Sequence, residues 1–194
     1  MISPFLKKIF ILMSDVKNMN SVSNSTAQNT KLCAAGNIYD TEFLRVLQVA
    51  DKIKCTDYVY FVIIMLQLFG GLRITEVLNI KCQHITNLGF VNVRGIKKSN
   101  NKFVNVPEIK DFLRNCKLSN LDPFFGISRF MVYRFYKKHL ISHLFVNSCN
   151  NSVTHFLRHL YAIQVNSTAD NINDVRDSMG HKSVNSTKHY IHTI

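Results

Sequence analysis

The longest apolar run of the sequence, YVYFVIIMLQLFGGL at residues 58–72, most constrains the fold. It falls short of the roughly 20 apolar residues that span a bilayer, and Gln67 and the pair Gly70-Gly71 interrupt it. We therefore expect no membrane partner for this run and read it as a buried helix. Thr56 is the predicted N-cap of that helix, which runs through Phe69 and ends at the two glycines.

A second, amphipathic helix is predicted just before the buried one. The segment EFLRVLQVADKI, which follows Thr41, carries Phe43, Leu44, Leu47 and Ala50 at helical spacing. These four side chains therefore lie on one face of a helix. Thr41 stands at its expected N-cap.

The first 38 residues differ from the rest of the chain. Residues 14–30 are polar, rich in Ser and Asn and without apolar periodicity, which is typical of a flexible linker. The segment MISPFLKKIFILM before them has two lysines and no small-residue cleavage site, which favours a weak amphipathic helix over a secretory signal. We therefore divide the chain into an N-terminal segment and linker, residues 1–38, and one domain, residues 39–194.

A β-hairpin is predicted in the middle of the chain. Residues 90–93 and 103–106 both alternate apolar and polar side chains, and they flank the polar stretch GIKKSNNK. Lys97, Lys98 and Lys102 are expected at the hairpin tip. Such a tip is either a solvated turn or a flexible arm that brings one ammonium group to a substrate.

The remaining segments predict helices, so the expected fold is mainly α with a small antiparallel β-sheet. Residues 127–145 combine large apolar side chains with basic ones, which predicts an amphipathic helix whose basic face either tracks a phosphate backbone or is simply solvated. Thr154 is the expected N-cap of the next helix. The other helices are expected at residues 108–116, 172–178 and 185–190.

The charge balance points to a polyanionic partner. The chain has 24 Lys and Arg against 12 Asp and Glu, a net charge of +12. Such an excess is common in proteins that bind nucleic acid. A solvated basic surface accounts for the charge alone equally well, so the nature of the partner depends on the motifs.

Cysteine and histidine patterns predict neither disulfides nor a metal site. The five cysteines are dispersed, odd in number and never arranged as C-x-x-C, which is typical of a reducing, intracellular compartment. His139 and His143 have the i, i+4 spacing of zinc ligands, but no H-E-x-x-H motif accompanies them. We therefore expect no metal.

Two pairs of charged residues are spaced to act together. Arg73 precedes Glu76 by three residues, so the carboxylate can hold the guanidinium, although an ordinary surface ion pair has the same spacing. His155 and Arg158 lie one turn apart on the predicted helix that starts at Thr154, so both donors face one space.

Three blocks of the sequence resemble the tyrosine recombinases, or phage integrases, from about residue 41 to the C-terminus. GLRITEVLNI is similar to the family's first box, THFLRHLYA to its H-x-x-R box, and MGHKSVNSTKHY to its closing box. The predicted hairpin resembles the one that bears the family's catalytic lysine, with Lys98 at that position and Lys97 as the alternative; Glu76 takes the supporting acidic position. The catalytic positions that the resemblance assigns are Arg73, Lys98, His155, Arg158, His181 and Tyr190.

The resemblance implies a phosphodiester reaction that needs neither metal nor ATP. Tyr190 would attack the phosphate, and Arg73 and Arg158 would compensate the charge of the transition state. His181 would donate to the same phosphate and His155 would help to manage the proton of the nucleophile. A hairpin lysine would protonate the departing 5′ hydroxyl. The product is a 3′-phosphotyrosyl link that keeps the bond energy for religation.

The expected function is therefore site-specific recombination or integration of double-stranded DNA, as in a mobile element, by an intracellular protein that stays with DNA. A type IB topoisomerase, a telomere-resolving strand transferase and a noncatalytic DNA-binding accessory protein are the alternatives. Family members carry a helical domain ahead of the catalytic one to clamp the duplex, and only a short segment precedes the first predicted helix here. The chain is then a fragment, a minimal enzyme that relies on a separate DNA-binding partner in place of the clamp, or a relic that binds DNA poorly. Self-association on DNA is expected through the helical faces.

Overall fold

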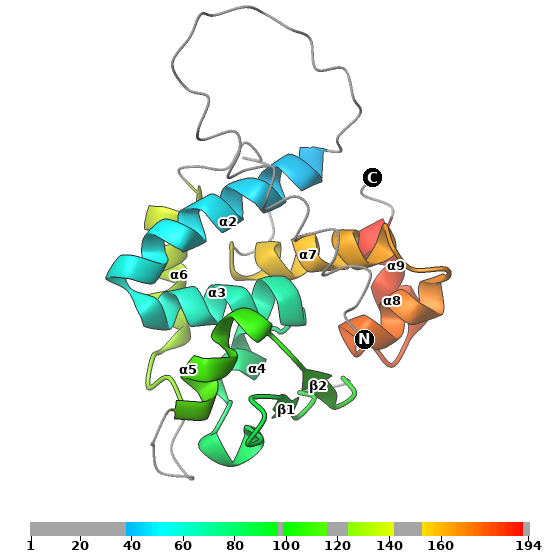
Figure 1. Ribbon diagram of the computed structural model, residues 1–194. Coiled ribbons are helices and arrows are strands. Elements are labelled where there is room, and N and C mark those ends of the chain that lie inside the picture. Colours follow the sequence, from blue (N-terminus) through cyan, green and yellow to red (C-terminus); the bar gives the residue numbers. More distant parts are fainter. Residues whose placement is uncertain (1–37, 97–98, 116–123, 142–152, 192–194) are drawn as a thin grey trace, which may run out of the picture. The chain divides into compact units, whose positions relative to one another are not determined.

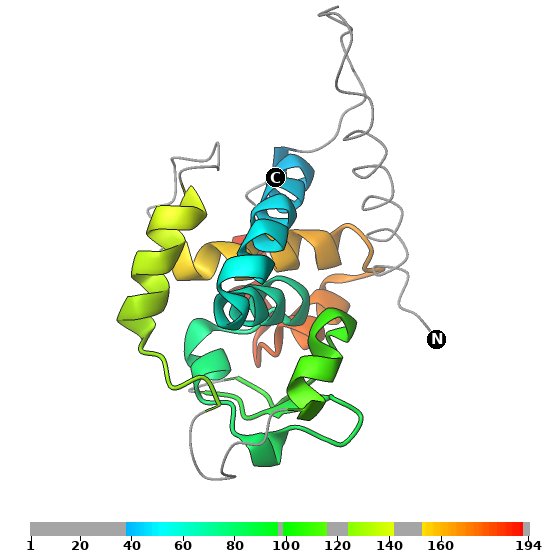
Figure 2. The same cartoon turned by 60° about the vertical axis from the view of Figure 1, so that its left-hand side comes forward.

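The computed structural model describes residues 38–96, 99–115, 124–141 and 153–191, with the side chains at 38–40, 114–115 and 189–191 left aside. At its centre lies α3 (Tyr58–Gly70), which packs between α2 (Ile38–Thr56) and α7 (Val153–Asn166) (Figure 1, Figure 2). Ten consecutive residues of α3, 61–70, are buried. The predicted buried helix is thus confirmed, and its burial on all sides follows from its lack of a polar face.

The ends of α2 and α3 differ from the predicted caps. Helix α2 begins at Ile38, so Thr41 lies inside it rather than at its N-cap. Thr56 is the last residue of α2, and Asp57 takes the N-cap position of α3. Both predicted caps were wrong, since α2 begins three residues before Thr41 and the N-cap of α3 lies one residue after Thr56. One capping side chain does not fix a helix end by itself.

The predicted hairpin is confirmed as a two-stranded antiparallel sheet of β1 (Val91–Val93) and β2 (Lys102–Val104), which lies below the helical core in both views (Figure 1, Figure 2). Its register pairs Val91 with Val104 and Val93 with Lys102. Lys102 is therefore the first residue of a strand and is buried, not a residue of the tip as predicted. Lys97 and Lys98 lie outside the described residues.

Two short α-helices, two 3-10 turns and one longer helix lie around the hairpin and the core. They are α4 (Ile74–Leu78), the 3-10 turns η1 (Cys82–His84) and η2 (Pro107–Ile109), α5 (Lys110–Asn115) and α6 (Arg129–His139). The basic side chains of α6 are exposed, as expected for its predicted polar face. The hydroxyl of Ser128 caps α6 by accepting a hydrogen bond from the amide of Met131 at 3.3 Å. His143 lies outside the described residues.

The last three helices carry the C-terminal blocks of the sequence. Helix α7 is followed by α8 (Ile172–Met179) and α9 (Val184–Ile191), close to the predicted bounds. Asn171 caps α8 by accepting from the amides of residues 173 and 174. Thr154 lies inside α7 and is buried, so the predicted cap was wrong; its carbonyl is instead held by another helix.

Gln67 is the side chain that binds the Thr154 carbonyl, and it is the one polar side chain in the buried stretch of α3. Its Nε2 donates to the Thr154 carbonyl at 2.9 Å and to the Leu72 carbonyl at 3.3 Å, and its Oε1 accepts from the Tyr136 hydroxyl at 2.8 Å. A buried amide needs such partners, because leaving them out costs about 1–3 kcal/mol for each polar group. Gln67 thereby fixes the chain after α3 against the first turn of α7.

Candidate active site

The turn after α3 positions the first arginine. Gly71 has a left-handed conformation, with φ of 59°, and a Cβ there would lie 2.2 Å from a ring carbon of Tyr161. Arg73 follows in extended conformation at the N-cap of α4. Its amide donates to Glu76 Oε2 and its Nη1 donates to Glu76 Oε1, both at 2.8 Å. The predicted ion pair is confirmed, and the carboxylate, which is 1% exposed, is no surface group.

Glu76 also faces the second arginine. Arg158 Nη1 lies 3.6 Å from Glu76 Oε2, and the Arg158 side chain is completely buried. Arg158 donates through Nη1 to the Gly71 carbonyl and through Nη2 to the Met179 carbonyl at 2.8 Å. Burying a guanidinium is tolerated only with such a set of acceptors. One carboxylate therefore holds two arginines that are far apart in the sequence.

His181 completes the same cluster. Its Nε2 lies 3.0 Å from Arg158 Nη2 and its Nδ1 lies 3.0 Å from the Thr187 hydroxyl. Because a guanidinium can only donate, Nε2 is the acceptor and Nδ1 carries the proton that is shared with Thr187. Burial, Arg158, Arg73 and Lys102 lower the pKa of His181 to about 4. The imidazole is therefore neutral at pH 7.

The segment just before β2 contacts this cluster. Ser99 and His181 form an antiparallel bridge, and the amide of Asn100 donates to the Gly180 carbonyl at 3.0 Å. The Ser99 hydroxyl accepts a hydrogen bond from Arg73 Nη1. The end of the hairpin is thus joined both to the first arginine and to the closing block of the sequence.

Lys102 is a member of the site that the sequence prediction missed. Its Nζ donates to the Gly71 carbonyl at 3.2 Å, the same oxygen that Arg158 binds, and lies 5.9 Å from the centre of the Tyr161 ring. Burial and the neighbouring arginines lower its pKa well below the usual value, against the opposing effect of Glu76. The burial of Lys102 could have been predicted from the strand pattern. Side chains alternate between the two faces of a strand, and Lys102 lies two residues before the inward-facing Val104.

The other predicted site residues are less completely placed. His155, on α7, is half-buried, and its pKa is lowered by burial and then by Arg129, Arg158 and Arg73, so it lies within the field of both site arginines. Tyr190 belongs to the last turn of α9, but its side chain lies outside the described part of the chain, as do Lys97 and Lys98.

Searches of the described residues for two other kinds of site were negative. No group of three His, Cys, Asp or Glu side chains is arranged to hold a metal ion there. Within the same residues, no helix is long and apolar enough to cross a membrane.

No protein-family model and no curated protein matches this sequence, whereas solved structures do. XerH site-specific recombinase bound to its difH substrate in a post-cleavage complex has a TM-score of 0.64 at 20% identity, over 89% of this chain and 54% of that one. XerA recombinase has a TM-score of 0.60 at 19% identity, over 87% and 62%. The catalytic domain of bacteriophage HP1 integrase has a TM-score of 0.56 at 18% identity, over 79% and 85%.

These likenesses establish the fold: a mainly helical domain with a two-stranded antiparallel sheet, that of the tyrosine recombinase catalytic domain. The chain spans only 62% of the XerA structure and 54% of the XerH structure.

Proposed function

We propose that this chain cleaves and rejoins DNA through a covalent bond between Tyr190 and a 3′ phosphate, and that it does so as a site-specific recombinase. The observation that carries the proposal is the cluster of Arg73, Arg158 and His181, which come from three distant blocks of the sequence. Glu76 accepts from Arg73 and lies 3.6 Å from Arg158, and Arg158 in turn donates to His181. A cluster of this kind suits an anionic transition state, because each hydrogen bond to the phosphate becomes stronger as negative charge develops on the phosphate oxygens.

The two arginines would divide the work of holding the phosphate. The Arg73 side chain is 28% exposed, so it can reach a phosphate that arrives from solvent, whereas Arg158 is buried behind it. A nonbridging oxygen would take the place of the Ser99 hydroxyl on Arg73 Nη1. If the backbone bridge between Ser99 and His181 then opened, the phosphate could also reach Arg158. Ser99 is therefore the group we expect the DNA to displace.

The covalent step balances without an external reagent. The Tyr190 oxygen attacks phosphorus, the bond from phosphorus to the 5′ oxygen breaks, and the tyrosine proton passes to a base while the leaving oxygen gains a proton. His155 suits the base, because its lowered pKa keeps the ring neutral and able to accept a proton at pH 7. His181 would first take up a proton, which the approaching phosphate favours, and then donate to it.

The proton donor to the leaving oxygen is a lysine of the hairpin. Lys98 is our proposal and Lys97 its alternative on sequence grounds. Lys102 is a third candidate because its amino group binds the same Gly71 carbonyl as Arg158, and burial and the arginines lower its pKa well below the usual value, so it gives up a proton more readily than an exposed lysine.

Trapping on a suicide substrate tests the proposal. Duplex DNA nicked just downstream of the cleavage site loses the short fragment that carries the freed 5′ hydroxyl after attack, so that a covalent complex accumulates and is seen on a denaturing gel. We expect wild type and Tyr133→Phe, which alters an exposed tyrosine of α6, to form the complex and Tyr190→Phe to form none. Equal trapping by Tyr190→Phe excludes Tyr190 as the nucleophile.

Recombination is separated from its alternatives by the DNA product. A plasmid that carries two target sites should give two circles or an inversion, whereas relaxation of a plasmid without any site indicates a topoisomerase. Absence of any product, together with a biological output that Tyr190→Phe leaves unchanged, indicates a noncatalytic DNA-binding protein.

A further inference from the structure

The β1–β2 hairpin has an outer face that the candidate site does not use. Val91 and Val93 on β1 and Lys102 and Val104 on β2 face inward and are buried. The alternate residues are exposed and therefore lie on the opposite face. Asn92 is the cross-strand partner of Phe103, and both belong to this outer face.

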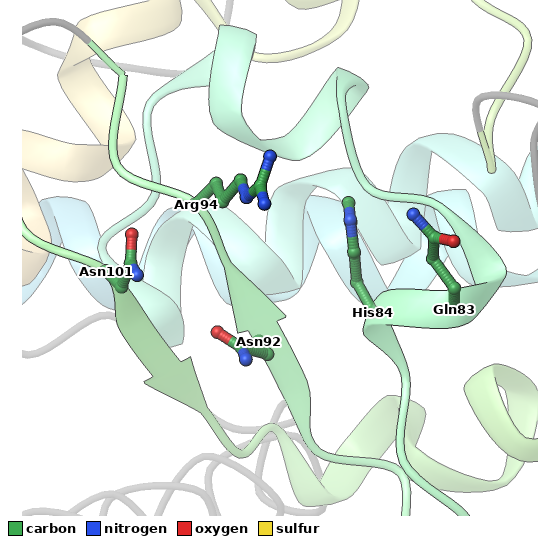
Figure 3. A pocket seen from close by; sticks show the side chains of 5 residues that line it. All are labelled: Gln83, His84, Asn92, Arg94 and Asn101. Atoms are coloured by element: carbon green, nitrogen blue, oxygen red, sulfur yellow. The ribbon is translucent and has the colours of Figure 1, made fainter.

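A hollow of about 450 Å³ lies on the outer face (Figure 3). In the view of Figure 3, Arg94 stands between Asn101, which comes from the neighbouring strand segment, and His84, which rises beside Gln83 from η1. The residues that line the hollow are Gln83, His84, Asn92, Arg94 and Asn101. All five can donate hydrogen bonds and none is acidic, so the hollow suits an anion with several acceptor oxygens.

Two hydrogen bonds from the backbone leave donor groups of His84 and Asn101 available to a ligand. The backbone amide of Lys81 donates to His84 Nδ1 at 3.1 Å, so the proton of the neutral ring is on Nε2. Burial, Arg94 and Lys81 lower the pKa of His84, which keeps the ring in that neutral form. The amide of Gly95 donates to Asn101 Oδ1 at 3.1 Å, which leaves the Asn101 NH₂ group to donate elsewhere.

An exposed aromatic pair lies beside the hollow. The rings of Phe90 and Phe103 are stacked, with centroids 5.1 Å apart and planes inclined by 13°. Phe103 is 65% exposed although it sits across the hairpin from Asn92. An aromatic face next to phosphate-binding donors is the combination by which proteins bind unpaired nucleotides, since a stacked base needs a free ring and its phosphate needs cations.

We infer that the outer face of the hairpin binds an unpaired DNA strand, with a backbone phosphate in the hollow at Arg94 and a base stacked on Phe103. The inference rests on the proposed function only for its choice of DNA as the nucleic acid. Paired bases in a duplex do not offer their faces to Phe103, which is why a single strand is the expected ligand. Strand exchange passes through such unpaired ends, and the two faces of the hairpin would then hold the cut phosphate and the freed strand.

Titration with a short oligonucleotide tests the stacking contact. The chain contains no tryptophan, so Phe103→Trp introduces a single indole whose fluorescence a stacked base quenches. We expect quenching by single-stranded DNA and none by inorganic phosphate. Phe130→Trp is the matched control, because Phe130 on α6 is also 65% exposed. Equal quenching of the two variants, or no quenching of Phe103→Trp, overturns the inference.

Salt dependence tests the phosphate contact separately. Arg94→Ala should lower the magnitude of the slope of log affinity against log salt by about 0.7 for single strands, and Arg94→Lys should restore it. Phe103→Leu should weaken single-strand binding about tenfold without changing that slope. Lys52→Ala, which removes an exposed charge on α2, should change neither. Duplex binding that falls as much as single-strand binding overturns the inference.

These measurements do not depend on cleavage. All of them can be made in a Tyr190→Phe background, where binding alone is read. Failure of wild type to be trapped on suicide DNA would remove the proposed function and leave the hairpin results standing. Loss of the quenching and slope effects in a protein that is trapped normally would remove only the present inference.

Discussion

Arg158 Nη2 lies 3.0 Å from His181 Nε2, and both side chains are buried. This contact fixes the protonation state of the histidine, because the guanidinium has no acceptor to offer and a protonated ring would bring two positive charges together. Met179 and Thr187 accept hydrogen bonds on either side. Without a bound anion, the cluster is therefore stable only while His181 is neutral.

The first prediction is a loss of stability in acid. The pKa of His181 is about 6.5 in an unfolded chain and about 4 in the folded protein. Protonation therefore favours unfolding, and the stability from neutral His181 is complete above about pH 6.5 and lost as the pH falls to about 4. The loss is at most about 3 kcal/mol. Urea denaturation of His181→Gln at a series of pH values should show a shallower decline than wild type; parallel curves would assign the decline to other groups.

A second prediction separates the two arginines by stability. Arg158→Ala removes a fully buried cation, leaves the Met179 carbonyl without this donor, and leaves Glu76 with Arg73 and the Gly71 carbonyl with Lys102. It should lower the free energy of unfolding by about 3–5 kcal/mol. Arg73→Ala removes a partly exposed partner while Glu76 keeps Arg158, so its cost should be about 1–2 kcal/mol. Denaturant titration measures both, and trapping on suicide DNA should be lost in both. Equal destabilisation contradicts the division between a buried and an accessible arginine.

Much of this arrangement follows from the sequence. The apolar run at residues 58–72 predicts a central helix because no face of it is polar, and the spacing of Arg73 and Glu76 predicts their ion pair. The roles of Gly71 and Met179 could not be predicted, because they act through backbone carbonyls that any residue has. Lys102 was misassigned to the hairpin tip because β2 starts one residue earlier than predicted, at a lysine that does not continue the apolar alternation.

A third prediction identifies the lysine that protonates the leaving group. DNA with sulfur in place of the bridging 5′ oxygen needs no proton donor, because a thiolate leaves readily. The variant that removes the true donor should therefore cleave ordinary DNA slowly, by about 10²–10⁴-fold, and the sulfur substrate at nearly the wild-type rate. We expect this rescue for Lys98→Ala and not for Lys102→Met. Rescue of Lys102→Met alone would move the role to the buried lysine.

A fourth prediction concerns the turn that carries Arg73. Gly71 and Gly126 both have φ of 59°, but a Cβ at Gly126 meets nothing within 4 Å, whereas one at Gly71 overlaps the Tyr161 ring. Gly126→Ala should cost only the left-handed strain, about 1–2 kcal/mol. Gly71→Ala adds the overlap, for about 2–5 kcal/mol in total. It should also abolish trapping, because the backbone shift that relieves the overlap displaces the carbonyl that Arg158 binds. Thermal unfolding of the pair measures the difference, and equal costs would argue against close packing of Tyr161.

The Gly71 carbonyl accepts from Arg158 across 87 positions of sequence. Closing a loop of that length is entropically unfavourable before other contacts form, so contacts of this kind arise late in folding. The consequence concerns timing during synthesis. A chain leaving the ribosome can gather Arg73, Arg158 and His181 into one cluster only after α7 and the residues that follow α8 have emerged and docked. A nascent chain that still lacks them holds the Arg73–Glu76 pair without the rest of the cluster.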